Sequence, residues 1–266
     1  MEEKIRLDIL MNLNGFSESR NIAKQLIVSN CVFVNNNLIN KSSTKISNNS
    51  VITIKNDNTI YVSRGAAKLE KALKSFNICV NGTVAIDVGA STGGFTDCLL
   101  QHGAKKIYAV DVGHEQLHEK LRKNEKVINI EDTNFRYIDC KLFKESVDII
   151  VADVSFISLK LILPKIVEIS HNNTDIVVLI KPQFEAGKNN VGKNGIVKDK
   201  KIHLVVLNNI KDYCFSNDIY IENITFSPIK GGDGNIEYLA HFKKGNISKY
   251  GNEQFKSLIS DAFVLL

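Results

Sequence analysis

Two lysines and two acids, far apart in the chain, are the residues best suited to do chemistry. They are Lys68, Asp153, Lys181 and Glu237, and each falls at or near the end of an expected strand or helix. A lysine amine that has lost its proton can accept one from a hydroxyl group, and carboxylates can orient such an amine. Any one of them alone is more often an ordinary surface charge. The four residues indicate a functional site because a glycine-rich loop occurs in the same pattern of strands and helices.

That loop spans residues 87–95 and reads Asp-Val-Gly-Ala-Ser-Thr-Gly-Gly-Phe. It follows an apolar strand and opens a helix, so glycines let a ligand approach the backbone and the helix N-terminus offers unpaired N–H groups. The spacing is not Gly-x-Gly-x-x-Gly, and a carboxylate at Asp87 suits the amino group of a methionine moiety better than a pyrophosphate. The alternative is a plain strand–helix turn. The candidate cofactor contacts are Asp87, Gly89, Ser91, Thr92, Gly93, Gly94 and Phe95.

Acids also end the strands that follow. Asp111, with Val112 beside it, closes the second strand, where a carboxylate hydrogen-bonds the ribose hydroxyls of an adenosine cofactor. Asp132 follows the third strand and is a weaker candidate for the adenine amino group. Asp153 ends the fourth strand, beside the reactive end of the expected cofactor. For each acid the alternative is a helix cap or a strand terminus.

Strands alternate with helices from residue 83 onward. The expected strands are 83–88, 106–111, 127–130, 147–153, 176–181, 220–227 and 237–242, and the expected helices lie near 94–102, 115–123, 159–169, 200–215 and 253–263. Such alternation predicts an α/β domain with a parallel, doubly wound sheet and helices on both faces. Ligands of these sheets bind beyond the carboxyl ends of the strands, where the candidate residues fall.

A small α+β unit precedes this domain. Two short helices are expected between residues 6 and 27, and strands at 31–34 and 51–54. A polar stretch follows and is typical of a linker. The predicted organisation is a first domain over residues 1–57, a linker over 58–62 and a second domain over 63–266.

The composition is that of a globular protein with one medium and one small domain. The 266 residues are 44% hydrophobic and 24% charged, and the net charge of +5 permits an anionic partner without requiring one. Five scattered cysteines form no Cys-x-x-Cys pair, which is typical of reduced thiols in a cytoplasmic protein. The sequence shows neither a signal-peptide pattern nor an apolar run of about 18 residues, so no membrane partner is expected.

Taken together, these features resemble the TlyA or hemolysin A family of ribosomal RNA 2′-O-methyltransferases, and the second half is similar to the FtsJ/RrmJ type of ribose methyltransferase. The resembling segments span nearly the whole chain: 6–8, 19–20, 61–69, 87–96, 152–158, 180–185 and 235–239. The resemblance implies an S4-like RNA-binding domain followed by a Rossmann-like methyltransferase domain. It also implies S-adenosyl-L-methionine as cofactor, a cytidine in ribosomal RNA as target, and ribosomal subunits as partners.

The family's Lys-Asp-Lys-Glu catalytic set falls on Lys68, Asp153, Lys181 and Glu237. Methyl transfer from a sulfonium is an in-line displacement, so positioning supplies much of the rate. Lys181 is the expected proton acceptor, since desolvation and the Lys68 ammonium favour its neutral form while Asp153 opposes this. Lys68 and Glu237 are expected to orient the target ribose and the lysines. The stretch 231–234 before Glu237 varies in the family, which leaves the shape of that loop open.

The first domain is expected to bind RNA. Its candidate contacts, together with one at the start of the second domain, are Arg6, Ser19, Arg20, Lys24 and Arg64. Residues 1–60 carry seven Lys or Arg and five Asp or Glu, which is a weak excess for a sole RNA anchor. The Gly-, Lys- and Asn-rich segment 182–198 is therefore interpreted as a loop of the second domain that grips the substrate.

Other readings of the sequence are less well supported. His114 and His118 have the i, i+4 spacing of metal ligands on a helix, but no third ligand is evident, so no metal is expected. A membrane-active hemolysin would need a signal peptide, a spanning segment or a long basic amphipathic helix, and the sequence shows none of these. An RNA-binding assembly factor without turnover is an alternative that only an assay can separate. The protein is expected to be a cytoplasmic monomer.

Overall fold

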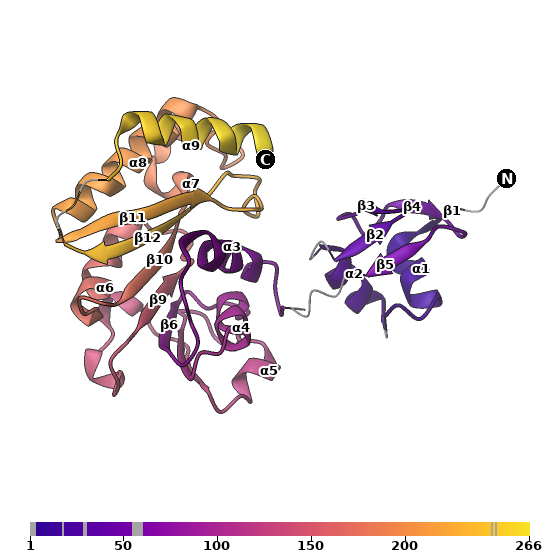
Figure 1. The fold of residues 1–266 in the computed structure, drawn as a ribbon, viewed down its shortest axis with the longest axis horizontal. Helices are drawn as coiled ribbons and strands as arrows, with labels where there is room; N and C mark the ends of the chain where they lie inside the picture. Colours follow the sequence, from indigo (N-terminus) through magenta and orange to yellow (C-terminus); the bar gives the residue numbers. More distant parts are fainter. Residues whose placement is uncertain (1–3, 18, 29–30, 55–60, 246, 248) are drawn as a thin grey trace. The chain divides into compact units, whose positions relative to one another are not determined.

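The structure is a computed structural model that describes residues 4–17, 19–28, 31–54, 61–245, 247 and 249–266. The chain divides into two compact units, Met1–Arg64 and Gly65–Leu266, which we call the N-terminal unit and the larger unit. Of the linker predicted over residues 58–62, positions 58–60 lie outside the described residues. Figure 1 labels the helices and strands of both units.

The N-terminal unit is a small α+β fold. Helices α1 (Leu7–Leu13) and α2 (Arg20–Val28) contact each other. A three-stranded antiparallel sheet has the order β3 (Asn37–Leu38), β2 (Val32–Val34), β5 (Ile52–Ile54), and a second antiparallel pair joins β1 (Lys4–Arg6) to β4 (Lys45–Ser47). The apolar positions of the helices form its core: Leu7, Leu10, Met11, Ala23, Leu26 and Ile27 are all buried. The turn after β2 uses Asn35 and Asn36 at positive φ, as expected for asparagine.

The larger unit is built on a seven-stranded sheet with the order β11-β12-β10-β9-β6-β7-β8. Its strands are β6 (Val84–Val88), β7 (Lys106–Val110), β8 (Val127–Ile130), β9 (Ile149–Ala152), β10 (Asp175–Ile180), β11 (Ile219–Phe226) and β12 (Tyr238–Lys244). The strands β6 to β10 run parallel, whereas β12 is antiparallel to both β10 and β11. The prediction of a parallel sheet therefore fails at β12, because β11 and β12 are joined by a loop without a crossover helix, and such a hairpin pairs antiparallel.

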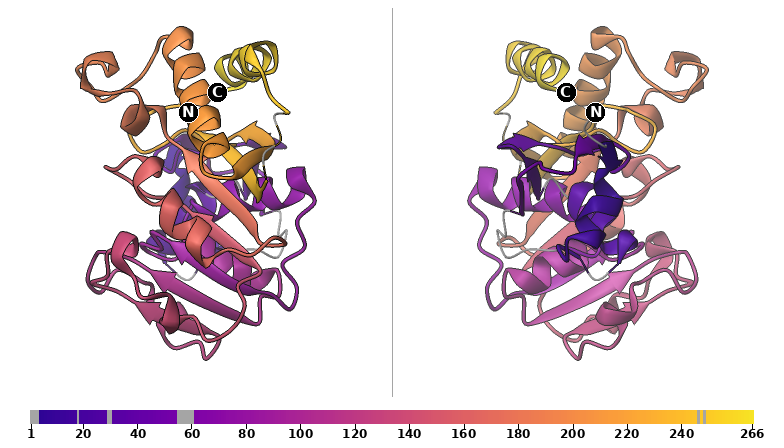
Figure 2. Two further views of the ribbon diagram at one scale, coloured as in Figure 1. Left: turned by 90° about the vertical axis from the view of Figure 1, so that its left-hand side faces the viewer. Right: turned by 90° about the vertical axis from the view of Figure 1, so that its right-hand side faces the viewer.

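Helices cover both faces of this sheet, as predicted (Figure 2). Alternate residues of the strands pack against α6 (Leu163–Ile169), α8 (Lys200–Phe215) and α9 (Asn252–Leu265) in one continuous core. On the other face, α3 (Ala66–Phe76) contacts β12 and α4 (Gly94–Gln101) contacts β6 and β7. The remaining short helices are α5 (Glu119–Arg122), α7 (Pro182–Glu185), η1 (Phe135–Tyr137), η2 (Cys140–Leu142), η3 (Leu159–Leu161) and η4 (Lys188–Asn190).

Two expected helices are shorter than predicted. The helix expected over residues 115–123 is reduced to α5, because the carboxylate of Glu131 accepts the backbone N–H groups of residues 115, 116 and 117 and fixes them as a loop. The helix expected over 159–169 is divided into η3 and α6, and Pro164 stands in the first turn of α6. Proline lacks the N–H that a continuous helix requires, so a new helix begins there.

Candidate active site

Four elements of the larger unit bring the lysines and acids to the same edge of the sheet. Asp153 directly follows β9 and Lys181 directly follows β10, so both stand at the carboxyl ends of parallel neighbours. Glu237 directly precedes β12, whose first residue, Tyr238, pairs with Ile180 at the end of β10. Lys68 lies in the first turns of α3, which packs on β12.

The four side chains form a continuous series of ion pairs. Lys68 Nζ lies 2.7 Å from Glu237 Oε2 and 3.5 Å from Asp153 Oδ2. Lys181 Nζ lies 2.6 Å from the other carboxylate oxygen of Asp153, Oδ1. Asp153 is thus shared by both ammonium groups, and two positive charges balance two negative ones in the order Lys181, Asp153, Lys68, Glu237.

This series is largely removed from solvent. The side chains of Lys68 and Lys181 are each 9% exposed and that of Glu237 is 2% exposed, while Asp153 is 20% exposed. A buried charge is tolerated when it is paired, and each of the four has at least one partner at close range. Asp153 is thus the most exposed of the four side chains.

Two residues that the sequence reading missed support these charges. Lys181 donates a hydrogen bond to Ser155 Oγ at 2.8 Å, which fixes the direction of its ammonium group. A Cβ at Gly231 would lie 2.4 Å from Glu237 Oε1, so only glycine leaves room for the carboxylate in this position. Ser155 stands two residues after Asp153, within a segment already singled out for its resemblance. Gly231 gave no signal of its own, since glycines are common in such loops.

An aromatic pair lies beside Lys181, and of its two rings Phe156 is exposed whereas Phe184 is half-buried. The Phe156 ring is 5.3 Å from the ring of Phe184, and Lys181 Nζ lies 5.8 Å from the Phe184 centroid. Phe156 is 88% exposed and has a φ of 66°, a backbone conformation that costs free energy for a bulky residue. Exposed aromatic rings of this kind are surfaces on which nucleic-acid bases stack.

The glycine-rich loop lies next to Asp153. Gly89 has a φ of 81°, and a Cβ there would meet the carbonyl oxygen of Asp153 at 2.9 Å, so glycine allows the ends of β6 and β9 to come together. Gly93 has a φ of 93° and precedes α4. Ser91 and Thr92 are exposed, whereas Gly93, Gly94 and Phe95 are buried and contribute packing.

Asp87 lies beneath this loop and is fully buried. Its Oδ2 accepts a hydrogen bond from the Thr96 hydroxyl at 2.7 Å, while among the described residues its Oδ1 has no hydrogen-bond partner. Burial, and secondarily the charge of Asp153, raise the pKa of Asp87 to about 7. A cationic amine near Oδ1 would relieve this cost, because it would stabilise the carboxylate form.

Asp111 and Asp132 have partners in the neighbouring loops. Asp111 accepts backbone hydrogen bonds from Ser91 at 2.8 Å and Gly113 at 2.7 Å, so it holds the glycine-rich loop against the end of β7. Asp132 pairs with the His114 ring at 2.8 Å, and this hydrogen bond raises the pKa of His114. Val112 is 70% exposed beside Asp111, in a place where an apolar ring system could cover it.

Strained backbone is concentrated at this edge of the sheet. Non-glycine residues with positive φ follow four adjacent strands in turn: Ser91 after β6, Glu115 after β7, Asp132 after β8 and Phe156 after β9. Conformations of this kind persist where the surrounding structure imposes them, and they cluster at ligand sites. Nothing in the spacing of the sequence predicted them.

The N-terminal unit contains all five predicted RNA contacts, including Arg64, which the sequence had placed at the start of the second domain. Arg6 and Arg20 both donate to Asp8, a buried carboxylate that the sequence reading missed, although it stands within the segment 6–8. Ser19 Oγ accepts the backbone N–H of Ile22 at 3.3 Å, which is the role of a helix N-cap. Lys24 and, at the end of this unit, Arg64 are exposed.

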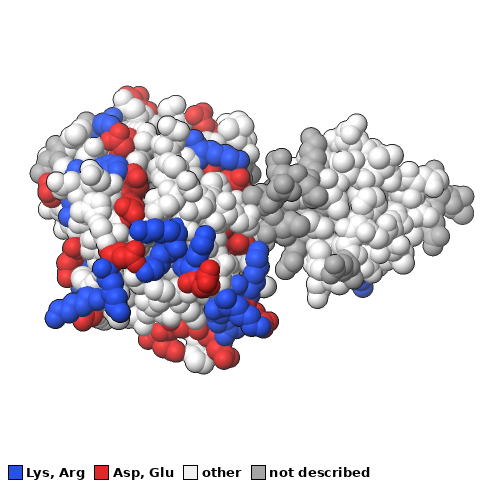
Figure 3. All heavy atoms as spheres, turned by 60° about the horizontal axis from the view of Figure 1, so that its bottom comes forward, with Lys and Arg blue, Asp and Glu red and all other residues white. Residues whose placement is uncertain are grey.

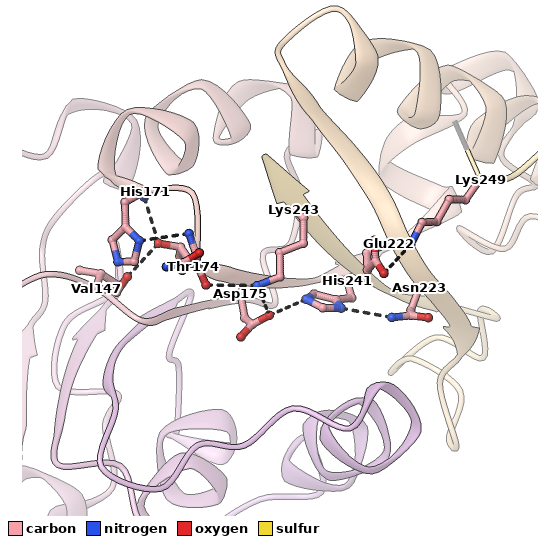
Figure 4. Close-up of polar contacts among 10 residues, drawn as sticks. Val147, His171, Thr174, Asp175, Glu222, Asn223, His241, Lys243 and Lys249 are labelled. Carbon is pink, nitrogen blue, oxygen red and sulfur yellow. Dashed lines mark hydrogen bonds and ion pairs between the residues drawn. The ribbon is translucent and has the colours of Figure 1, made fainter. Parts of the chain in front are cut away.

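Other charged groups of the larger unit have structural roles. On the face shown in Figure 3, lysine and arginine side chains gather in groups with acids among them. At the amino end of β10, Asp175 Oδ1 lies 2.7 Å from both His241 Nε2 and Lys243 Nζ (Figure 4). This network lies at the opposite end of β10 from Lys181, so it anchors β12 and takes no part in the candidate site.

The histidines with metal-ligand spacing do not share a helix face. His118 caps α5 by accepting the N–H of Lys120, while His114 lies in the preceding loop. Within the described ranges, no three His, Cys, Asp or Glu side chains are grouped as metal ligands would be. No helix in the described part of the chain is long and apolar enough to cross a membrane.

Comparison with known proteins defines the class to which this fold and site belong. Residues 61–244 match the FtsJ-like methyltransferase family and residues 5–52 match the S4 domain. The chain is therefore an FtsJ-like methyltransferase with an S4 domain in its N-terminal unit.

Individual relatives narrow the class. The chain is 46% identical over 239 residues to hemolysin A of Brachyspira hyodysenteriae, which covers 90% of this chain and 99% of that protein. It is 38% identical over 239 residues to the 16S/23S rRNA (cytidine-2′-O)-methyltransferase TlyA of Mycobacterium tuberculosis, with 90% and 89% covered. A solved structure of a Streptococcus thermophilus protein with the designation hemolysin has a TM-score of 0.75 and 40% identity, and covers 100% of this chain and 98% of that one. The chain belongs to the TlyA and hemolysin A family, which confirms the resemblance found in the sequence.

Proposed function

We propose that this protein transfers a methyl group from S-adenosylmethionine to the 2′-hydroxyl of a cytidine ribose in ribosomal RNA. The observation that carries the proposal is the series of ion pairs from Lys181 to Glu237, which opens to solvent at Asp153 beside the glycine-rich loop. Relatives that match nine-tenths of the chain are named for this reaction, and their names supply the target base.

Lys181 is the proposed proton acceptor. It contacts one carboxylate, which it shares with Lys68, and its hydrogen bond to Ser155 fixes the ammonium direction. Lys68 contacts two carboxylates, and removing its proton would leave Glu237 as an uncompensated charge at 2% exposure. Of the two lysines, Lys181 is therefore the one that can become neutral with less disturbance and receive the proton of the ribose hydroxyl.

Lys68, Asp153 and Glu237 are proposed to position the reacting groups. Asp153 holds Lys181 through one oxygen and Lys68 through the other, so it sets the spacing between the two amines. Glu237 holds Lys68 in place through an ion pair at 2.7 Å. Precise placement of this kind is worth a large share of the rate in a displacement reaction.

The residues at the ends of β6 and β7 fit the cofactor. When bound, S-adenosylmethionine supplies a methyl group on a positively charged sulfur. The buried Oδ1 of Asp87, without a hydrogen-bond partner among the described residues, suits the cofactor's amino group. In this proposal Asp111 receives the ribose hydroxyls and Val112 covers the adenine, and the exposed residues Ser91 and Thr92 complete the binding surface.

The decisive experiment uses isolated small and large ribosomal subunits and S-adenosylmethionine labelled in its methyl group. Lys181→Met removes the amine while keeping the length of the side chain, and we expect a loss of about 100- to 10,000-fold in the rate of labelling. Lys201→Met is the matched control, because Lys201 is an exposed lysine of the same unit. Its rate is expected to equal that of the unchanged protein.

The subunit that carries the label identifies the substrate. Equal labelling by the Lys181→Met variant would refute the role of Lys181. Bound cofactor with no label on either subunit would refute ribosomal RNA as the acceptor, and it would favour a non-catalytic RNA-binding role.

A further inference from the structure

Asp8 is the buried carboxylate at the start of α1, and it has no role in the proposed methyl transfer. Its side chain is 0% exposed. It accepts two hydrogen bonds from Arg6, at 2.9 Å from Nε and 3.1 Å from Nη2, and one from Arg20 Nη2 at 3.1 Å. These contacts hold the pKa of Asp8 at about 2, chiefly through the hydrogen bond from Arg6. The group is therefore a fixed negative charge at neutral pH.

The two arginines are held but remain accessible. The side chain of Arg6 is 39% exposed and that of Arg20 is 51% exposed. A guanidinium group has five N–H donors, and among the described residues Asp8 is the partner of two from Arg6 and one from Arg20. Most donors of both groups are thus available to a ligand. Arginines that are fixed by one acid lose less rotamer freedom when they bind a second anion.

A third cation faces the same side. Arg6 in β1 is directly opposite Lys45 in β4, and residues directly opposite each other in an antiparallel pair point to the same face. Lys45 is exposed. The strand carrying Lys45 and the loop before it are tied to α1, because Leu7 N and Asp8 N donate to Thr44 O at 2.8 Å and Ser42 O at 3.2 Å. Backbone hydrogen bonds therefore hold the strand that carries Lys45 against the segment that carries Arg6 and Asp8.

We propose that Asp8 is a positioning residue that fixes Arg6 and Arg20 as a preformed clamp for backbone phosphates of RNA, with Lys45 on the same face. The inference rests on the proposed function, in which this unit binds ribosomal RNA. Arginine forks suit phosphate oxygens, and contacts to phosphates position a protein on its nucleic acid. Asp8 acts through the arginines and does not touch the ligand.

Asp8→Asn distinguishes this role from simple charge attraction, because the two explanations predict changes in RNA affinity of opposite sign. The substitution removes a negative charge, so charge attraction alone would tighten RNA binding. Loss of a preformed clamp would weaken it. With a fluorescein-labelled RNA hairpin and the full-length protein, we expect about tenfold weaker binding. We also expect the slope of log affinity against log salt to stay unchanged from about 50 to 200 mM, because the number of phosphates contacted is the same.

Further variants complete the test. Glu125→Gln changes the net charge equally at an exposed site of the larger unit, and it should not weaken binding. Arg6→Lys keeps the charge but cannot form the two-point contact with Asp8, and its effect should be strongly non-additive with that of Asp8→Asn. If Asp8→Asn fails to fold, the RNA affinities of Arg6→Lys and Arg20→Lys test the clamp instead. Both positions are exposed, so these variants are expected to fold. Lys201→Arg, at an exposed lysine of the larger unit that is not among the candidate RNA contacts, is their control for exchange of a cation.

The outcomes separate the inference from the proposed function. A folded Asp8→Asn protein that binds RNA as tightly as the unchanged protein, or more tightly, overturns the clamp while leaving the enzyme proposal intact. Equal affinity for the Arg6→Lys and Arg20→Lys variants does the same. An unchanged protein that fails to bind the hairpin and ribosomal subunits alike overturns RNA as the partner, and the clamp with it.

Discussion

The ion pair between Lys68 and Glu237 is buried, and breaking it should cost more folding free energy than breaking an exposed ion pair of the same length. Lys68 Nζ is 2.7 Å from Glu237 Oε2, with side-chain exposures of 9% and 2%. Lys256 and Glu253 on α9 are separated by the same 2.7 Å, with exposures of 56% and 82%. The two pairs differ mainly in burial, so they form a matched comparison.

Lys68→Met should lower the free energy of unfolding by about 3–5 kcal/mol, because it leaves the Glu237 carboxylate buried without its counter-charge. Glu237→Gln should cost less, about 1–3 kcal/mol, because the amide oxygen can still accept a hydrogen bond and Lys68 keeps Asp153 at 3.5 Å. The double variant should recover most of the loss, since no unpaired charge is left. Lys256→Met should cost about 0–1 kcal/mol.

Urea unfolding followed by far-UV circular dichroism gives these free energies. Hydrogen exchange of peptides from β10 and β12 reports the larger unit directly, so that unfolding of the N-terminal unit does not enter the measurement. The reasoning is refuted if Lys68→Met costs no more than Lys256→Met, or if the double variant loses the sum of the single losses. Methyl transfer by the double variant should stay abolished even where stability returns.

Three further changes test other parts of the site. Gly231→Ala places a Cβ 2.4 Å from Glu237 Oε1, so we expect methyl transfer to fall by about a hundredfold in a steady-state assay. Phe156→Gly removes an exposed ring from a backbone with φ of 66°, so thermal unfolding should show a gain of about 1 kcal/mol while RNA binding weakens about tenfold. Cofactor affinity should rise with pH up to about 7 and then level off, because the pKa of Asp87 is raised to about 7 and an amine binds its charged form; calorimetry in buffers of different ionisation enthalpy would detect the proton released.

Each of these three predictions can be checked with a control variant or by a result that would contradict it. Gly251→Ala introduces a Cβ with only an ordinary contact at 3.4 Å and should keep full activity; equal effects at both glycines would dismiss the steric argument. Phe156→Tyr should retain RNA binding, and a Phe156→Gly protein with unchanged affinity would exclude stacking. Asp87→Asn should remove the pH dependence of cofactor binding. The folding stability of the cofactor-free protein should change with pH in the opposite direction to cofactor affinity. The contribution of protonated Asp87 to stability is fully present below pH 3.8 and is lost as pH rises through about 7.

The positions of the candidate residues along the chain could be predicted because strand ends are visible in a sequence. Asp153 and Lys181 each close an apolar run, and the carboxyl ends of parallel strands must meet at one edge. The glycine-rich loop could be predicted for the same reason, because it directly follows the end of an apolar strand. The S4 and methyltransferase resemblance was carried by short segments around these points, and the comparisons confirm it.

What could not be predicted depends on contacts between distant parts of the chain. The direction of β12 follows from a hairpin with β11, and apolar alternation alone does not distinguish it from a parallel strand. Residues 115–117 became a loop because Glu131 captures their N–H groups, a contact with no local signal. Asp8 stands in the segment 6–8 that carries the resemblance, but its burial and its contacts with Arg6 and Arg20 depend on the packing of β1, α1 and α2, which the sequence pattern does not show.

The place of β12 in the sheet has a consequence for the order in which the molecule is made. During synthesis the chain emerges from its amino terminus, so β11 appears before the strand that separates it from β10. Until β12 arrives, β11 has no neighbour in the sheet order, and Lys68 lacks a carboxylate that lies 169 positions later. Pairings over such sequence distances form late, because the intervening chain must first be closed into a loop. The charge series is therefore completed only when nearly the whole polypeptide has been made, and a chain that ends before β12 lacks one of its four charges.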